Sequence, residues 1–463
     1  MTRKSTIFYA IFLIGIGNTN AQKDLECKTK LSMFHEPAKA KKYDVAYEPW
    51  LYVKTNCPDL SLATYADGEK ILKHKIENTK GEKKKRFVED LLELLKARQN
   101  YFSSNTPKGE FGAKGCQLLY DHKDELGKSK AELYSCFNDV FNTDKETFTH
   151  PKSLYTYFFL MVELFDDRKK TDAELFNTYD DINEKIQVEI QNYSEKLNAL
   201  ISKMESGKTL NQKEDNQKKV YESYLKNYTL IQDNIDAMVS RRANCDNLIP
   251  LYSGDFEVHK SDSTWLKRAV SRMYHKQCTE ALLYENLVKQ YDEIAPSADT
   301  KVYVATVLLK KGKDKDANQY LEEGYKLETR PYKKSNLAIK IGMIYKNKGQ
   351  YGKARSYLLD AIKLNPSNGK PHLLIADMYA ESAKNKNCGK DNFYQRALYW
   401  LAAKEALKAS RVDPTLQKLA NQYAVSHESK APTKEEIFLS GLAGKTITVG
   451  CWINRSVVVP ELD

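Results

Sequence analysis

The sequence predicts an all-α protein built from repeated helical hairpins, interrupted by one long antiparallel coiled-coil hairpin and followed by a small C-terminal β-hairpin. Three observations lead to this fold class. Glycine and proline are sparse, at 20 and 13 of 463 residues, and 29% of the residues are charged. Small and aromatic residues return at a fixed spacing towards both ends of the chain. The middle carries a heptad pattern instead. Because 463 residues exceed what one core usually holds, we expect more than one unit.

The first 21 residues have the pattern of a signal peptide. Arg3 and Lys4 give a positive start, residues 7–16 are mostly apolar, and Thr19-Asn20-Ala21 has the small-residue spacing of a cleavage site. The alternative is a membrane helix, but the apolar run is well short of the roughly 20 residues that a spanning helix needs. We therefore expect cleavage after Ala21 and export of a soluble mature chain.

The positive net charge does not indicate nucleic acid as a partner. The formal charge is +11, and removal of Arg3 and Lys4 leaves +9, spread over lysine-rich helix faces. The densest basic run is at residues 83–86, for which we favour a solvated helix face over an anion-binding patch. We expect no nucleic-acid partner for an exported chain.

Residues 335–368 carry the clearest repeat. Its signature positions are Gly342, Tyr345, Ala354, Leu358, Ala361 and Pro366. This spacing is similar to the tetratricopeptide pattern, except that Ala338 stands where the first tryptophan is usual. Gly342 and Ala354 are small enough for two helices to approach closely, and Pro366 stops the second helix.

Weaker copies of this pattern occur on both sides of the chain's middle. They are marked by Ala46, Trp50, Val53 and Pro58 near the N-terminus, by Ala317, Leu321 and Gly324 upstream of the clearest repeat, and by Ala402, Ala406, Ala409 and Pro414 downstream of it. Further helix pairs are predicted at residues 60–77 with 82–98 and at 116–126 with 129–141.

The eight cysteines fit these hairpins. Cysteines at the start of a first helix and the end of its second helix lie side by side, as Cys27 with Cys57 and Cys245 with Cys278 do. Cys116 and Cys136 are equally far from a predicted turn near Leu126 and Gly127, so they lie level across their hairpin. An oxidising compartment lets such cysteines pair. The predicted disulfides are Cys27 with Cys57, Cys116 with Cys136, Cys245 with Cys278 and, by elimination, Cys388 with Cys451. The alternative is eight free, buried thiols.

The middle of the chain predicts a long helical arm. Apolar residues from Leu175 to Met204, and again from Tyr221 to Met238, follow a heptad spacing with one stutter, and a short polar turn separates the two runs. The arm serves dimerisation or docking, or it is an extra-long pair that packs on its neighbours; the sequence leaves both readings open.

The last segment predicts a short helix and a β-hairpin. Thr433 and Glu436 form a capping box, and two short strands follow around Asn454 and Arg455. A lone hairpin is marginal in water, so we expect it to lie against the last helices, tied by Cys451. The chain thus divides into a signal peptide (1–21), N-terminal hairpins (22–150), a helix with the coiled-coil hairpin (151–244), a C-terminal repeat array (245–414), and capping helices with the β-hairpin (415–463).

A search for catalytic or ligand-binding motifs finds none. Gly444-Lys445-Thr446 imitates the end of a phosphate-binding loop, but Leu439 stands where the earlier glycine is required. No cysteine pair has the close spacing of a zinc ribbon or redox centre. We therefore predict no catalytic, cofactor-binding or metal-ligating residues.

Together, the signal peptide, the repeats at residues 46–58 and 335–368 and the closing GCWIN segment resemble the secreted tetratricopeptide repeat proteins of Gram-negative bacterial envelopes. The resemblance covers most of the mature chain, although the strict motif covers only the two best repeats. It implies a scaffold of the periplasm, free or peripheral on the outer membrane, which presents a concave surface to a partner. It does not name the partner.

We therefore expect a non-catalytic scaffold for partner proteins, without cofactor or metal. First helices of stacked pairs line a concave face, and its expected outward residues are Asn336, Lys340, Lys346 and His372. The lysines suit acidic partners, and outer-membrane proteins are a further class of partner. Two alternatives stay open, namely an accessory subunit of an outer-membrane assembly or uptake complex and an enzyme with an unrecognised site.

Overall fold

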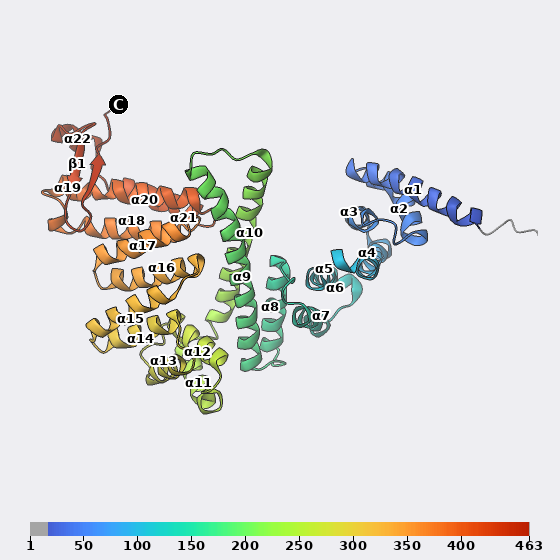
Figure 1. Ribbon diagram of the computed structural model, residues 1–463, viewed down its shortest axis with the longest axis horizontal. Coiled ribbons are helices and arrows are strands. Elements are labelled where there is room, and N and C mark those ends of the chain that lie inside the picture. The colour runs from blue at the N-terminus through green and yellow to red at the C-terminus, as the bar shows by residue number, and fades with distance from the viewer. Residues whose placement is uncertain (1–16, 463) are drawn as a thin grey trace, which may run out of the picture. The chain divides into compact units, whose positions relative to one another are not determined.

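The computed structural model describes residues 17–462 and is predominantly α-helical, with one pair of short strands near the C-terminus (Figure 1). Residues 1–16 of the predicted signal peptide lie outside this part. Within the described residues, no helix combines the length and apolar character that crossing a membrane requires. The chain divides into two compact units, Met1–Thr178 and Tyr179–Asp463, which we describe separately.

The first unit consists of helices that pair with their neighbours in sequence. They are α1 (Gly17–Lys39), α2 (Tyr43–Asn56), α3 (Ala63–Glu77), α4 (Gly81–Tyr101), α5 (Lys108–Asp121), α6 (Lys123–Leu126), α7 (Lys130–Thr143) and α8 (Pro151–Asp166), with a 3-10 turn, η1 (Ser103–Asn105), after α4. The pairs predicted at residues 60–98 and 116–141 are α3 with α4 and α5 with α7.

Trp50 joins the first hairpin to the next helix. Its indole is buried in the core beside Ala46, and its Nε1 donates a hydrogen bond to the Thr64 carbonyl oxygen at 2.7 Å. Gly68 on α3 leaves the necessary space, since a Cβ there would lie 2.4 Å from Trp50 Nε1. The repeat-core role predicted for this tryptophan therefore extends to packing between consecutive hairpins.

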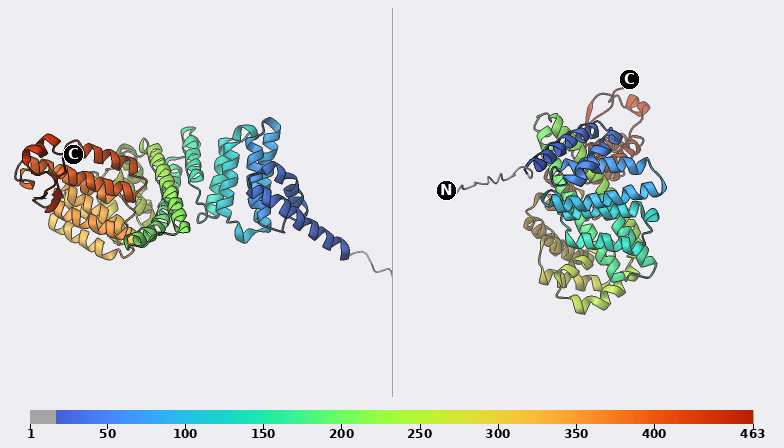
Figure 2. Two further views of the ribbon diagram at one scale, coloured as in Figure 1. Left: turned by 90° about the horizontal axis from the view of Figure 1, so that it is seen from above. Right: turned by 90° about the vertical axis from the view of Figure 1, so that its right-hand side faces the viewer.

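The second unit contains the arm and the repeat array. The arm is α9 (Asp172–Glu205, of which residues from Tyr179 belong to this unit) with α10 (Gln212–Ser240). The array and its cap are α11 (Cys245–His259), α12 (Ser263–His275), α13 (Leu282–Ile294), α14 (Ala298–Lys310), α15 (Asp314–Leu327), α16 (Pro331–Asn347), α17 (Tyr351–Leu364), α18 (Lys370–Ser382), η2 (Lys386–Cys388), α19 (Asn392–Arg396), α20 (Leu398–Val412), α21 (Gln417–Glu428), α22 (Lys434–Ser440), β1 (Thr446–Val449) and β2 (Arg455–Val458). Figures 1 and 2 show the hairpins α14–α15, α16–α17 and α18–α20 next to one another in chain order.

The hairpin of α16 and α17 shows why the repeat uses small residues. A Cβ at Gly342 would lie 2.9 Å from Leu358 Cγ and 3.3 Å from the Ala354 carbonyl oxygen. The predicted core positions Tyr345, Ala354, Leu358 and Ala361 are all buried here. Helix α17 ends at Leu364, two residues before Pro366, as the fixed geometry of proline requires.

The arm is an antiparallel helical pair, as the heptad spacing predicts. Ile182 and Ile186 on α9 and Ile235 on α10 are buried in its seam. The rings of Tyr193 and Tyr224 stack with centroids 4.6 Å apart. Met204 departs from the pattern, since it is exposed near the turn.

Four disulfides join the eight cysteines in the predicted pairs. They are Cys27–Cys57, Cys116–Cys136, Cys245–Cys278 and Cys388–Cys451. Each of the first three closes one local hairpin, as predicted from the positions of their cysteines relative to the hairpin turn.

The β-hairpin lies against the last repeats, as expected. Strands β1 and β2 are antiparallel, with Thr446 opposite Val458. In the loop between them, Trp452 stacks on Tyr379 and donates its Nε1 hydrogen to Ser382 Oγ at 2.9 Å. Apolar residues of the two strands belong to the same core cluster as the repeats, so the hairpin is part of the array's core.

Loss of a disulfide should loosen one hairpin and leave the others intact. Replacing Cys116 and Cys136 with serine removes a link across 20 residues, which we expect to cost about 3 kcal/mol of local stability. Hydrogen exchange followed by mass spectrometry should show faster exchange in α5 and α7 and unchanged exchange in α16 and α17. Equal acceleration throughout the chain would contradict local clamping.

Gly342→Ala should destabilise the second unit by about 1–3 kcal/mol, because its methyl group overpacks the contact with Leu358. Gly254→Ala is the matched control, since Gly254 is exposed in the middle of α11 and a Cβ there meets nothing within 4 Å. The control should gain about 0.5–1 kcal/mol from helix propensity. Denaturant unfolding measures both, and equal effects would refute the packing argument.

Candidate partner-binding face

The candidate site is the side of α14, α16 and α18 that carries their partly exposed residues. On α16, Asn336, Lys340 and Met343 follow at intervals of four and three residues, so they share one side of the helix. Met343 is 37% exposed. We name this side the A-helix face; it comprises Asp299 on α14, Asn336, Lys340, Met343 and Lys346 on α16, and Asp377 and Glu381 on α18. The buried Tyr303 of α14 contacts it through Lys340.

Lys340 links the first helices of two neighbouring hairpins. Its Nζ lies 3.1 Å from Asp299 Oδ1 and 5.5 Å from the centre of the Tyr303 ring. Burial by itself lowers the pKa of this lysine, but Tyr303 and Asp299 outweigh burial and raise the pKa above its ordinary value. Lys340 therefore carries a permanent positive charge, and its side chain is still 27% exposed.

His275, the last residue of α12, experiences the positive charges of Lys340 on α16, of Lys370 on α18 and of Lys276, which follows it directly. The ring keeps contact with solvent, yet the surrounding helices exclude enough water for desolvation to lower the pKa of His275 below its ordinary value. Lys340 and Lys370 lower this pKa further, as does Lys276, and Asp299 opposes them. This corner of the face is therefore basic.

Lys346 is also paired within the chain. Its Nζ lies 2.9 Å from Glu381 Oε1 on α18, and Tyr351 donates a hydrogen bond to Glu381 Oε2 at 2.6 Å. The Lys346 side chain is only 17% exposed. Both predicted lysines thus neutralise a carboxylate of an adjacent first helix, and an acidic partner has to compete with that carboxylate.

His372 does not face outward, which corrects the expectation from the sequence. It is buried, and its Nδ1 lies 2.6 Å from Glu405 Oε1 on α20. Glu405 also accepts a hydrogen bond from Lys408 Nζ at 2.8 Å. His372 therefore joins α18 to its own second helix, because that helix carries a buried carboxylate that needs a partner.

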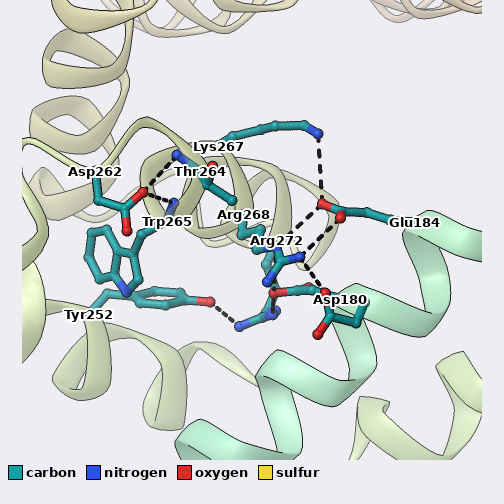
Figure 3. Close-up of polar contacts among 10 residues, drawn as sticks. Asp180, Glu184, Tyr252, Asp262, Thr264, Trp265, Lys267, Arg268 and Arg272 are labelled. Atoms are coloured by element: carbon teal, nitrogen blue, oxygen red, sulfur yellow. Dashed lines mark hydrogen bonds and ion pairs between the residues drawn. The ribbon is translucent and has the colours of Figure 1, made fainter. Parts of the chain in front are cut away.

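The arm is fixed to the array by an ionic cluster between α9 and α12 (Figure 3). Arg268 Nη2 lies 2.9 Å from both Asp181 Oδ1 and Glu184 Oε2. Arg272 is buried, and it pairs with Asp180 and contacts the Tyr252 hydroxyl. We call this cluster the arm joint.

A second contact holds α9 further along the array. Asn198 Nδ2 donates to Asn365 Oδ1 at 2.8 Å, and Asn198 Oδ1 accepts from the Ser367 amide at 3.0 Å. Of the two readings of the arm, packing on its neighbours is therefore present in the structure. Dimerisation through the arm stays a prediction.

The basic run at residues 83–86 is divided between the surface and a cleft of the first unit. Lys84 Nζ lies 2.7 Å from Glu125 Oε1 and lines a cleft of about 620 Å³ together with Lys73 and Lys80. Carboxylates line the same cleft, so its charges are balanced. The described residues contain no group of three or more His, Cys, Asp or Glu side chains that could hold a metal ion.

Sequence reasoning missed Asp299, Tyr303 and His275. The sequence contains a signal for the first two. Ala317, Leu321 and Gly324 lie 37 residues before Ala354, Leu358 and Ala361 of the clearest repeat. The same offset places Asp299 and Tyr303 at the positions of Asn336 and Lys340. His275 lies outside that period, at the end of α12, and no sequence signal marks it.

Comparison with known proteins identifies the hairpin that carries Lys340. Residues 336–368 match the model of the tetratricopeptide repeat family. The chain contains a tetratricopeptide repeat. The match covers α16 and α17 but not the other hairpins, and no curated protein matches the sequence.

Several solved structures are similar to the chain at low identity. They include the human IFIT1 dimer with PPP-AAAA (11% identity, 90% of this chain and 95% of that chain, TM-score 0.30), yeast Tom70 (12%, 92% and 96%, 0.28) and the apo quorum sensor NprR from B. thuringiensis (12%, 88% and 99%, 0.25). These TM-scores are too low to support an argument, so the tetratricopeptide assignment rests on residues 336–368.

Lys340→Met should raise the pKa of His275, because it removes one of the positive charges that disfavour the imidazolium form. An NMR titration of the histidine ring signals measures this change. Lys346→Met is the control and should leave the His275 titration unchanged, since Lys346 pairs with Glu381 on another helix. An unchanged pKa in the Lys340 variant would exclude the basic corner.

Proposed function

We propose that the protein is a non-catalytic scaffold that binds acidic partner proteins through the A-helix face. The observations that carry this proposal are Lys340, which lies 5.5 Å from the centre of the Tyr303 ring and is still 27% exposed, and the positive charges of Lys340, Lys370 and Lys276, which act together on His275. Carboxylates of a partner would meet charges that the fold already holds in place, so little side-chain entropy is lost on binding.

The distribution of charge along the chain supports an acidic partner. Residues 331–430, which include α16 to α21, contain 18 lysine and arginine residues but only 7 aspartate and glutamate residues. The α16 and α18 residues of the A-helix face therefore lie in a strongly basic part of the chain. A basic surface attracts acidic partners over distances up to about one Debye length and raises the association rate.

We propose the bacterial periplasm as the place where this scaffold acts, either free or peripheral on the outer membrane. The described residues hold no free cysteine, and disulfides persist in oxidising compartments such as the periplasm. The pattern of residues 1–21 supports export in the same way.

Photo-crosslinking in intact cells tests the A-helix face directly. A photoreactive residue at Asn336 or Met343 should yield partner adducts that mass spectrometry identifies, and the adducts should decrease with Lys340→Gln. We use glutamine because charge reversal would place a glutamate against Asp299, whereas the exposed ion pair itself contributes only about 0–1 kcal/mol.

Leu359 is the matched control position, because it is 42% exposed on the second helix of the same hairpin. It should yield few adducts. If Leu359 gives the same adducts as Asn336, or if neither Asn336 nor Met343 gives any, the A-helix face is not the binding surface.

A further inference from the structure

The turn between the two helices of the last hairpin is an insertion with its own structure. The turn from α14 to α15 spans residues 311–313 and that from α16 to α17 spans residues 348–350, whereas residues 383–397 separate α18 from α20. The insertion contains η2 and α19. We call residues 384–390 the lysine loop.

The lysine loop is held rigidly. Cys388 is fully buried, is disulfide-bonded to Cys451, and accepts a hydrogen bond from the Gly450 amide at 3.2 Å through its carbonyl oxygen. Asn385 accepts a hydrogen bond from the Asn387 amide at 2.9 Å. Gly389 packs so closely that a Cβ there would lie 2.6 Å from the Gln395 nitrogen. The backbone of the loop is therefore fixed at its middle and at its end.

The loop presents three lysines without ion-pair partners. Lys384, Lys386 and Lys390 are exposed, and none of them forms an ion pair with a described residue; Lys390 Nζ lies 4.2 Å from the centre of the Tyr394 ring. The two neighbouring carboxylates are engaged elsewhere, because Glu381 pairs with Lys346 and Asp391 caps α19 by accepting a hydrogen bond from the Tyr394 amide. A partner can therefore bind these lysines without displacing a carboxylate of the protein. At Lys340 and Lys346 it would have to displace Asp299 and Glu381.

We propose that the lysine loop binds an acidic polypeptide segment of a partner, at a surface distinct from the A-helix face. Three ammonium groups on a rigid backbone match carboxylates spaced along an extended chain, and the loop loses little conformational entropy on binding.

A lipid surface fits the loop less well than a polypeptide. The small apolar residues of the insertion, Ala383, Cys388 and Ala397, are buried, and its aromatic residues Phe393 and Tyr394 pack against the core of the array and are only partly exposed. The insertion therefore offers a bilayer no fully exposed apolar side chain. Charge alone recruits a protein to anionic lipid when roughly four to eight basic residues cluster, and the loop has three.

Fluorescence anisotropy of the oxidised, full-length mature chain with a labelled peptide of alternating glutamate and serine tests the proposal. The variant Lys384→Gln, Lys386→Gln, Lys390→Gln should bind this peptide about tenfold more weakly at low salt, as expected for the loss of three modest charge pairs. The matched control is Lys83→Gln, Lys85→Gln, Arg86→Gln, which removes the same charge from the basic run of the first unit. This control should bind within about twofold of the wild type. Unchanged binding by the loop variant, or equal weakening in both variants, overturns the proposal.

Two further measurements separate the proposal from its alternatives. Cys388→Ser with Cys451→Ser should weaken peptide binding while the helical circular dichroism is kept, and full affinity without the disulfide would overturn the role of the rigid backbone. Co-sedimentation with phosphatidylglycerol vesicles that depends on the loop lysines, without peptide binding, would replace the polypeptide with a lipid surface. Crosslinking at Asn336 does not involve the loop, so the A-helix face and the lysine loop can fail independently.

Discussion

The close approach of paired helices is the constraint on which the rest of the second unit depends. Gly342 and Ala354 bring α16 and α17 together until the Leu358 side chain fills the remaining space. The same helix α16 also lies near the first helices on either side of it, where Lys340 reaches Asp299 on α14 and Lys346 reaches Glu381 on α18. A larger residue in place of Gly342 would push α16 away from α17, so the helix that carries both lysines depends on this contact for its position.

Packing also decides which charges are available to a partner. Stacked first helices bring lysines and carboxylates into contact. Each such pair neutralises one positive charge that would otherwise be available to a partner. A residue in an insertion is not subject to this stacking. Lys384, Lys386 and Lys390 form no ion pair with a described residue, because the insertion leaves the repeat and the disulfide to Cys451 replaces helix packing as its support. The loop lysines thus differ from Lys340 and Lys346, each of which holds a carboxylate of a neighbouring first helix.

The sequence was sufficient to predict what each hairpin does by itself. Helical periodicity located the helix pairs, the level positions of Cys116 and Cys136 predicted their disulfide, and the capping box at Thr433 predicted the start of α22. These features depend on residues that are close in sequence.

Polar contacts between residues far apart in the sequence were not predictable in this way. The inward position of His372 depends on Glu405, which lies 33 residues further along, and the arm joint pairs Asp180 with Arg272 across 92 residues. A spacing pattern shows which side of a helix is apolar, but it does not show which polar residue of another helix lies opposite. Of the residues expected on the outward face, Asn336, Lys340 and Lys346 are partly exposed on α16, whereas His372 is buried.

The arm adds a restraint that a plain repeat array lacks. In a solenoid each repeat contacts only its neighbours, so small changes at successive interfaces add up to a change in curvature. Helix α9 is tied to α12 at the arm joint and, through Asn198, to the loop between α17 and α18. One continuous helix thereby connects elements separated by two hairpins, and any change in curvature between them has to stretch the helix or break one of its two contacts. Lys340 on α16 lies within this span, between the arm joint and the loop that Asn198 contacts. The arm therefore restrains the position of α16 in the array from both sides of that helix along the chain.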